Sequence, residues 1–241
     1  MMHSARALLL VLIMLIAGPA AAAMLSVSPV TLEIAAPRTN AKLNLENRGE
    51  EPVTVQIRVF RWASKNGKES LTPTTSVVAS PPMATLKPQG KYTVRIVRVA
   101  KEPVTSEESY RLLVDQLPKL VNQPGSAVSF LIRQSIPVFF TTAELQKPSL
   151  IWSARIEGSK LVLAVENKGR RRAKLSKIKF NSPAGVTNGP DDGLAGYVLA
   201  GSTAQWVQPS PRGLAPGAKI TIVAQNEHGP VEATAVVGAA D

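Results

Sequence analysis

The chain has no cysteine among its 241 residues. Disulfide bonds and thiolate-bound metal sites are therefore excluded, and there is no cysteine to carry the lipid of a lipoprotein. The stability of the fold must come from burial of apolar side chains.

Histidine is scarce, with His228 the only one beyond the first few residues. Hydrolases and metalloenzymes need converging nucleophiles, bases and ligands, and the sequence lacks a Gly-x-Ser-x-Gly, phosphate-loop or zinc pattern. Adjacent carboxylates on an extended chain point in opposite directions, which argues against an acid–base couple and favours solubilising or turn residues. The adjacent pairs are Glu50-Glu51, Glu107-Glu108 and Asp191-Asp192. We expect no enzymatic activity, no metal site and no cofactor.

Long apolar runs are also missing. The run Leu8–Ala17 follows His3 and Arg6 and is shorter than the ~20 residues of a membrane span. It leads to the small residues Ala21–Ala23, which suit a signal peptidase. We expect residues 1–23 to be a signal peptide cleaved near Ala23, leaving a soluble exported protein without a membrane segment.

Helical periodicity of useful length is absent. Short stretches of alternating apolar and polar residues are instead separated by Gly, Pro, Asn and Asp, which is typical of an all-β protein. In the first half, the expected strands are Leu25–Leu32 (interrupted by Pro29), Lys42–Glu46, Val53–Val59, Tyr92–Val99, Tyr110–Leu117 and Val128–Phe140. Further extended segments are bounded by Pro81-Pro82 and Pro88–Gly90. With these, about seven strands at this spacing indicate an immunoglobulin-like sandwich.

The alternation restarts after residues 143–148. The expected strands there are Leu161–Val165, Ala173–Phe180, Tyr197–Val207, Lys219–Ala224 and Glu232–Val237, with a long loop at Pro183–Gly196. The predicted domains are an N-terminal immunoglobulin-like domain at 24–142, a linker at 143–148 and a C-terminal β-sandwich at 149–241.

One expected strand could bind a partner. Val128, Phe130 and Ile132 alternate with other residues after Pro124-Gly125 and would share one face. The segment is either an ordinary core strand or, at a sheet edge, a template for another chain's sheet. Burial of each large apolar side chain contributes ~1.5–3 kcal/mol, whereas a surface ion pair contributes ~0–1 kcal/mol. At an edge, affinity would come from the strand, and charges would set its register.

Several segments resemble the periplasmic pilus (fimbrial) assembly chaperones, in particular the archaic, non-classical branch associated with spore-coat-U-like subunits. These segments are Val27-Ser-Pro-Val, Val53–Trp62, Ser80-Pro-Pro-Met83, Leu86–Gly90, Tyr110–Pro118, Ile136-Pro-Val-Phe139 and Tyr197–Ser202. The likeness covers nearly the whole chain after residue 23 and is stronger up to Phe140.

The resemblance implies a boomerang of two immunoglobulin-like domains in the periplasm. The last strand of the first domain would complete the unfinished sandwich of a pilus or coat-type subunit, without ATP, and the subunit would pass to an outer-membrane usher. Val128, Phe130 and Ile132 fall on the donor positions of that strand.

The sequence departs from the family at the anchor for the subunit's terminal carboxylate. The classical family uses an arginine in the first strand and a lysine near the end of the donor strand, where this chain has Thr31 and Pro137. A threonine cannot replace the forked hydrogen bonds of a guanidinium. The replacement candidates are Arg95, Arg98, Arg111 and Arg133, with Arg95 and Arg111 preferred. Each could instead be a solvated arginine on a strand face.

The formal net charge is +11, but the export signal argues against nucleic acid as a partner. The densest basic stretch, Lys168–Lys179, is either a solvated turn and strand face or a contact for an usher or an acidic subunit. The alternative to a chaperone is a structural adhesin or pilus component built from similar sandwiches.

Overall fold

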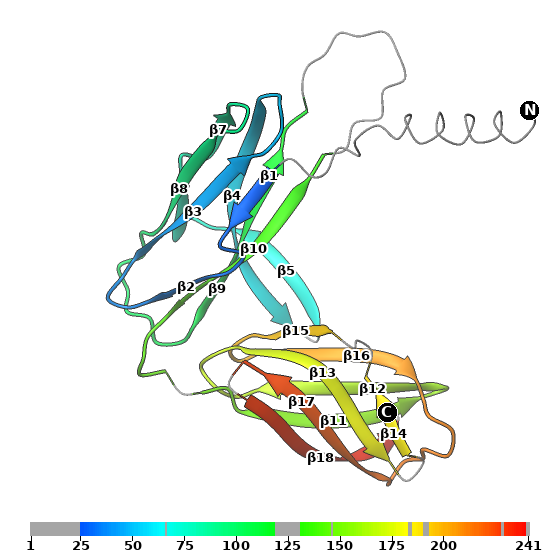
Figure 1. Cartoon of the computed structure of the whole chain (residues 1–241). Helices are drawn as coiled ribbons and strands as arrows, with labels where there is room; N and C mark the ends of the chain where they lie inside the picture. The colour runs from blue at the N-terminus through cyan, green and yellow to red at the C-terminus, as the bar shows by residue number, and fades with distance from the viewer. Residues whose placement is uncertain are drawn as a thin grey trace, which may run out of the picture.

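The computed structural model describes residues 25–65, 67–118, 131–145, 147–182, 185–189, 193–227 and 229–239. All regular structure in these ranges is β-strand. The strands form two sandwiches that meet at an angle (Figure 1), which confirms the expected all-β, two-sandwich, boomerang-like architecture. Within the same ranges, no helix combines the length and apolar character that a membrane crossing requires.

Ten strands build the N-terminal sandwich, more than the seven expected. They are β1 (Leu25–Ser28), β2 (Leu32–Ala35), β3 (Asn40–Asn47), β4 (Val53–Lys65), β5 (Lys68–Pro73), β6 (Val77–Ser80), β7 (Met83–Leu86), β8 (Lys91–Arg98), β9 (Glu108–Gln116) and β10 (Arg133–Thr141). One sheet has the order β1-β3-β8-β6, and the other has the order β2-β10-β9-β4-β5 with β7 also on β4. Only β2 and β10 pair in parallel among the described strands of this sandwich.

The first expected strand divides between the two sheets. β1 pairs with β3, whereas β2 pairs with β10 in the opposite sheet. Pro29 lies between them and has no N–H to continue a ladder, so the chain leaves one sheet there and enters the other. The interruption predicted at Pro29 is therefore a change of sheet.

Alternating residues of both sheets fill the core of this sandwich. Leu43, Leu45, Val94 and Ile96 come from the four-stranded sheet, and Ile57, Leu112, Val138 and Phe140 come from the six-stranded sheet, all at most 2% exposed. The apolar face predicted for Val53–Val59 is confirmed by burial of Val53, Val55 and Ile57.

Eight strands build the C-terminal sandwich. They are β11 (Leu150–Glu157), β12 (Lys160–Asn167), β13 (Ala173–Ser182), β14 (Gly185–Asn188), β15 (Leu194–Val198), β16 (Thr203–Pro209), β17 (Lys219–Asn226) and β18 (Gly229–Ala239). The order is β14-β13-β17-β18-β11-β12-β16, with β15 also on β13. β18 bridges the two faces because it pairs with both β17 and β11.

Two expectations for this half are wrong. Tyr197–Val207 is not one strand, because the chain turns between β15 and β16, where the Ser202 N–H and hydroxyl both donate to the Leu199 carbonyl. The stretch Pro183–Gly196 is not one long loop, since β14 and the start of β15 lie on β13 there. In addition, β11 is not among the expected strands.

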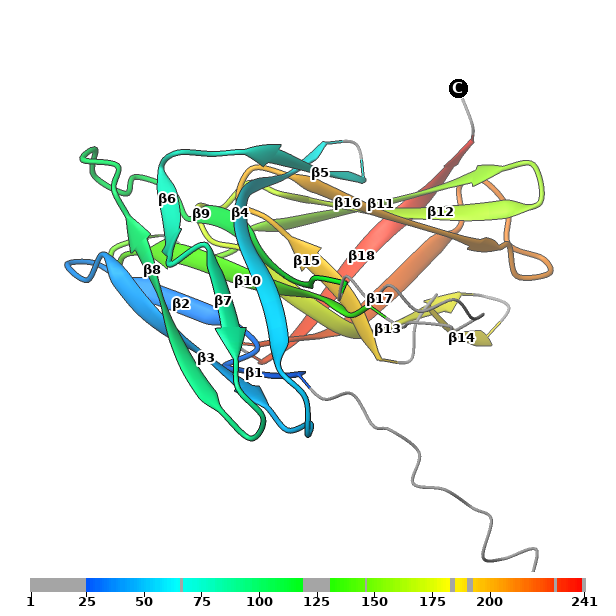
Figure 2. The same ribbon diagram turned by 90° about the horizontal axis from the view of Figure 1, so that it is seen from above.

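The sandwiches are joined through the interval between β10 and β11, which contains the predicted linker 143–148. The exact domain boundaries stay a prediction. A second connection is the β4–β5 hairpin, which reaches from the N-terminal sandwich to β16 (Figure 2). At its tip, the Gly67 N–H and the Ser64 hydroxyl both donate to the Thr203 carbonyl, at 3.2 and 3.1 Å.

Candidate functional site

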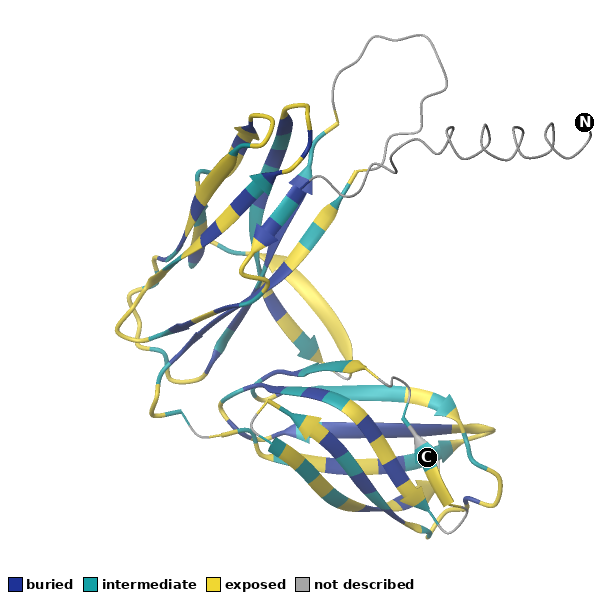
Figure 3. Cartoon of the chain, in the orientation of Figure 1, coloured by how far each residue is buried: buried dark blue, intermediate teal, exposed yellow. Residues whose placement is uncertain are grey.

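The two halves of β10 differ in their pairing. Val138–Thr141 pair with β2 on one side, and β9 continues along the other side from Arg133 to Phe140. Among the described residues, Arg133–Pro137 therefore have a strand neighbour on one side only. Burial increases along the strand, since Arg133 and Ser135 are exposed while Ile136 and all later residues of β10 are buried (Figure 3). The first half of β10 is an open sheet edge, and such an edge can pair with another chain.

Of the three residues expected to donate, Val128 and Phe130 lie outside the described residues. Ile132 is half-buried, and its carbonyl accepts a hydrogen bond from the Gln116 N–H at 3.0 Å. Ile132 thus directly precedes the open edge and is fastened to β9. The donor roles of all three residues stay a prediction.

Arg111 lies on the face of the six-stranded sheet that turns toward the C-terminal sandwich. In the register of the sheet it is opposite Pro137 of β10 and Phe60 of β4. Its guanidinium carbon is 3.7 Å from the ring centre of Trp62 and 5.9 Å from that of Tyr197. The Arg111 side chain makes no hydrogen bond or ion pair with the residues that the structure describes. Burial lowers its pKa, and nearby Glu69 offsets part of this.

The other three candidate arginines have different surroundings. Arg98 is buried and donates to both Glu108 oxygens at 2.9 and 2.8 Å. Arg133 is ion-paired with Asp115. Arg95 is exposed on β8, in the four-stranded sheet.

The two positions of the family anchor are unsuited to binding a carboxylate. The Thr31 hydroxyl donates to the Val30 carbonyl at 2.9 Å. Pro137 is buried and has no N–H.

An aromatic cluster joins the two sandwiches next to Arg111. Trp62 and Phe139 of the N-terminal sandwich pack against Tyr197 and Leu199 of the C-terminal one. The ring of Tyr197 meets Trp62 edge-on, with centres 5.4 Å apart. Such pairs contribute about 0.5–1.5 kcal/mol beyond their area.

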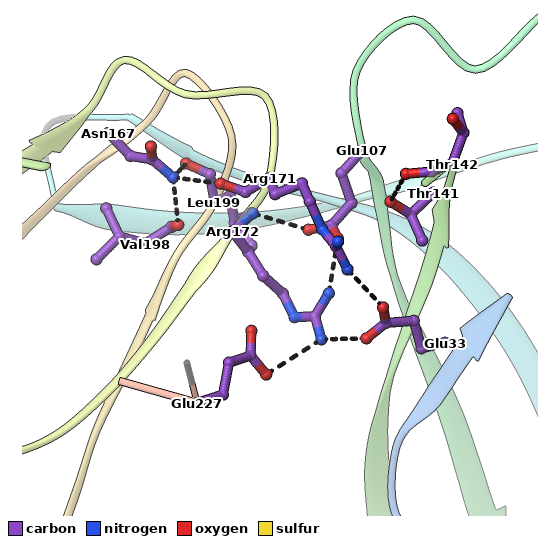
Figure 4. A network of polar contacts seen from close by, with 10 residues as sticks. All are labelled: Glu33, Glu107, Thr141, Thr142, Asn167, Arg171, Arg172, Val198, Leu199 and Glu227. Atoms are coloured by element: carbon purple, nitrogen blue, oxygen red, sulfur yellow. Dashed lines mark hydrogen bonds and ion pairs between the residues drawn. The ribbon is translucent and has the colours of Figure 1, made fainter. Parts of the chain in front are cut away.

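Arg172 belongs to a buried ion-pair network (Figure 4), and its guanidinium carbon lies 3.8 Å from the ring centre of Phe139 in this cluster. Arg172, which precedes β13, donates to Glu107 and Glu33 of the N-terminal sandwich, each at 2.6 Å, and it lies 3.4 Å from Glu227. The Arg172 N–H also donates to Glu107 at 3.0 Å. Since the Arg172 and Glu107 side chains are 4% and 0% exposed, the pair is removed from water. The network fixes the orientation of the two sandwiches.

Glu107 directly precedes β9 and Glu108 is its first residue, and the pKa values of these two glutamates shift in opposite directions. Burial raises the pKa of Glu107, and the bonds from Arg172 offset this only in part. Burial is also the largest single influence on Glu108 and raises its pKa, but the hydrogen bond and charge of Arg98, with smaller contributions from Tyr110 and Arg61, together outweigh burial and the pKa is lowered. Burial lowers the pKa of Arg172, yet the surrounding carboxylates outweigh it and the pKa is raised.

Sequence reasoning missed this network. It treated Glu107 as a solubilising or turn residue and Arg172 as part of the basic stretch Lys168–Lys179. The structure divides that stretch, because Arg171 and Arg172 pair with Glu33 while Lys177 and Lys179 are exposed. A repeated Glu-Asn-basic-Gly sequence, at 46–49 and 166–169, was the available signal for the turn that positions these arginines.

Comparison with known proteins gives a family match. Residues 24–146 match the model of the pili and flagellar-assembly chaperone, PapD N-terminal domain. A comparison with curated proteins finds no match.

Solved structures extend the likeness over both sandwiches. One is the complex of the chaperone CsuC with the tip adhesion subunit CsuE, a pre-assembly complex from archaic chaperone-usher Csu pili of Acinetobacter baumannii. Its matching chain is 28% identical with a TM-score of 0.68, and the match covers 91% of this chain and 100% of that one. The YadV chaperone is 20% identical (TM-score 0.62, covering 89% and 100%). A chain of the Salmonella enterica SafA pilin–SafB chaperone complex is 18% identical (TM-score 0.58, covering 87% and 95%). These last two show a shared fold.

Proposed function

Because the chain belongs to the pili and flagellar-assembly chaperone family, we propose that it holds pilus or coat-type subunits at the open edge of β10 and delivers them to an outer-membrane usher. It is a periplasmic assembly chaperone, and the alternative of a structural adhesin or pilus component is not favoured. The observation that carries the proposed site is the one-sided pairing of Arg133–Pro137.

The subunit would add a strand along this edge. Main-chain hydrogen bonds would supply affinity without sequence specificity, and alternate side chains of Val128, Phe130 and Ile132 would fill pockets of the partner. A complex of this kind needs no nucleotide, metal or other cofactor. The family is one of chaperones, and we expect no catalytic step.

Arg111 is the anchor for the subunit's terminal carboxylate. Directly opposite side chains on antiparallel strands have Cβ atoms about 4.5–5.5 Å apart. Arg111 is opposite Pro137, so it can present a guanidinium close to where other family members have a lysine. Its side chain is held by Trp62 and not by a carboxylate of the described residues, which leaves the donors available for a forked bond to the subunit.

The remaining candidates fit less well. Arg98 and Arg133 already bind carboxylates of this chain, and breaking those pairs would offset the gain from a new one. Arg95 belongs to the sheet that does not contain β10, so it is not a neighbour of the open edge.

We also propose that the protein is exported to the periplasm. Residues 1–23 are a signal peptide removed near Ala23, which the mass of the mature protein purified from the periplasm would check. The domains span 24–142 and 149–241.

The test is periplasmic co-expression with a pilus subunit encoded beside the chaperone. The variant carries Phe130→Asp and Ile132→Asp, which place two charges in the donor segment. The control carries Ile151→Asp and Val236→Asp, two exposed positions of the C-terminal sandwich, 54% and 64% exposed. We expect the native protein and the control to protect and co-purify the subunit, and the donor variant to lose it.

Circular dichroism establishes that each variant is folded. Equal subunit recovery with the donor variant and the native protein would contradict strand donation and leave Val128–Ile132 as an ordinary core strand. Recovery of no complex with the native protein would favour the adhesin alternative.

A further inference from the structure

A carboxylate bound by two arginines lies at the start of β10. Asp115 of β9 is 8% exposed. Its Oδ2 accepts a bond from Arg58 of β4 at 2.6 Å, and its Oδ1 accepts one from Arg133. The three residues line a surface pocket of ≈ 370 Å³ together with Ile132 and Leu131.

The carboxylate is well suited to remain charged. Burial raises the pKa of Asp115, but the hydrogen bonds and charges of Arg133 and Arg58 together outweigh burial, and the pKa lies below its usual range. Asp115 is therefore an anion throughout the neutral range, and both guanidinium groups can stay bound.

The two arginines are not equivalent. The side chain of Arg58 is 40% exposed and comes from a strand within the sheet, whereas that of Arg133 is 62% exposed and comes from the open edge. Arg133 directly follows Ile132 and lies opposite Asp115 in the register. The Gln116 N–H donates to the Ile132 carbonyl, so Ile132 at the end of the donor segment and Arg133 after it are tied to two consecutive residues of β9.

Register matters at this point because a shift of one residue moves every side chain of a strand to the opposite face. A shifted segment would turn Ile132 away from the face that it shares with Ile136 and Val138. Arg58 holds the Asp115 carboxylate in place, and Arg133 is the contact that ties the segment to it.

We propose that Asp115 is a positioning residue that fixes the register of the donor segment through Arg133 before a subunit binds. This inference rests on the proposed function, but it also makes a prediction for the free chaperone. If the ion pair holds the segment, its loss must loosen the Gln116–Ile132 bond and leave the rest of β9 unchanged.

Hydrogen exchange of single amides in the free, full-length mature protein tests this. The Gln116 amide donates to Ile132, while the adjacent Leu117 amide donates to Thr54 of β4 at 2.8 Å and is an internal control. In Asp115→Asn and in Arg133→Gln, we expect Gln116 to exchange about three- to tenfold faster, as loss of a partly exposed ion pair allows. The exchange rate of the Leu117 amide should be unchanged in Arg133→Gln, and Arg133→Lys should restore part of the protection of the Gln116 amide.

A matched control is Arg48→Gln, which removes an exposed arginine from its pair with Glu46. It makes the same change in net charge and should leave Gln116 unaffected. Unchanged Gln116 exchange in Arg133→Gln would overturn the proposal, and so would equal acceleration of Gln116 and Leu117.

Subunit capture separates this inference from the proposed function. With the neighbouring subunit, Arg133→Gln should lower recovery about three- to tenfold, and Arg133→Lys should lie between it and the native protein. Faster Gln116 exchange with unchanged recovery would overturn the role of Asp115 in capture, while a loss of recovery with Phe130→Asp and Ile132→Asp would still support strand donation.

Discussion

The turn after β3 and the turn after β12 are built alike, one in each sandwich. Each begins with a buried asparagine, Asn47 or Asn167, 0% exposed. The Asn47 amide donates to the carbonyls of Glu51, Leu86 and Lys87, and the Asn167 amide to those of Arg171, Val198 and Leu199. Each side-chain oxygen accepts from the glycine two residues on.

The residues after the two turns differ. After Asn47 the chain continues with the exposed Glu50 and Glu51. After Asn167 it continues with Arg171 and Arg172, which bind carboxylates of the other sandwich. The same local hydrogen bonding therefore stabilises one domain by itself, while in the other domain it also positions the residues that set the angle between the two.

The largest expected effect comes from removing the interdomain arginine. Arg172→Met leaves Glu107 buried without its partner, and breaking a buried pair costs about 3–5 kcal/mol. Urea unfolding measures the loss. The control is Arg48→Met, at an exposed pair in the corresponding turn of the N-terminal sandwich, which should cost less than about 0.5 kcal/mol. Equal losses for Arg172→Met and Arg48→Met would contradict the difference between the two turns.

The next largest effect is expected from removing either buried asparagine. Asn47→Ala and Asn167→Ala each leave buried carbonyls without a donor, and we expect each to cost about 2–4 kcal/mol by urea unfolding. Small-angle X-ray scattering should detect a change in shape only for Asn167→Ala. A change of shape with Asn47→Ala would show that both turns control the domain angle.

A smaller loss is expected at a glycine of the second turn. A Cβ added at Gly169 would lie 2.4 Å from the Lys147 carbonyl oxygen and 2.7 Å from the Ser149 nitrogen. Gly169→Ala should therefore cost about 1–3 kcal/mol in thermal or urea unfolding. Gly193→Ala meets no atom within 4 Å and should be near neutral. A neutral Gly169→Ala would mean that the segment before β11 moves freely.

The smallest effects are in the pH dependence of stability, where the two adjacent glutamates should differ in sign. Because the pKa of Glu107 is raised, the folded protein binds a proton at this carboxylate at a higher pH than the unfolded protein does. The native protein therefore gains stability relative to Glu107→Gln as pH falls from that pKa toward about 4.3. The lowered pKa of Glu108 gives a change of stability with pH of the opposite sign. Its contribution is present above about 4.3 and is lost as pH falls through the folded pKa, relative to Glu108→Gln.

Urea unfolding at several pH values measures both differences. Slopes of the same sign for the two variants would contradict the assignment of Glu107 to the interdomain network and Glu108 to the pair with Arg98.

Sequence patterns were sufficient to predict structure where residues close together in the chain determine it. Alternation at Val53–Val59 located β4, and Pro29 marked the point where the first strand breaks. β14 and the start of β15 were missed because Gly, Pro and Asp signals for a loop dominate that stretch, and pairing with β13 overrides them. The interdomain network could not be predicted, because Glu33, Glu107 and Arg172 are far apart in sequence and meet only through the packing of the two sandwiches.

The candidate site was predicted in part. The donor segment was predicted from its alternating apolar residues and from a resemblance, and Arg111 was one of four candidate arginines. The choice of Arg111 among the four depends on two structural facts. These are its register opposite Pro137 and the pairing of Arg98 and Arg133 with carboxylates.

The central claim is that the subunit's terminal carboxylate binds Arg111 beside the open edge of β10. The most direct measurement is the affinity of native, Arg111→Gln and Arg95→Gln chaperones for two forms of the neighbouring subunit, one native and one with two residues added at its C-terminus. Loss of a hydrogen bond to a charged group should weaken binding by about tenfold or more. We expect the extension and Arg111→Gln each to cause this loss and their combination to cause no further loss, while Arg95→Gln has no effect. Independent, multiplicative losses for the extension and Arg111→Gln would contradict the central claim.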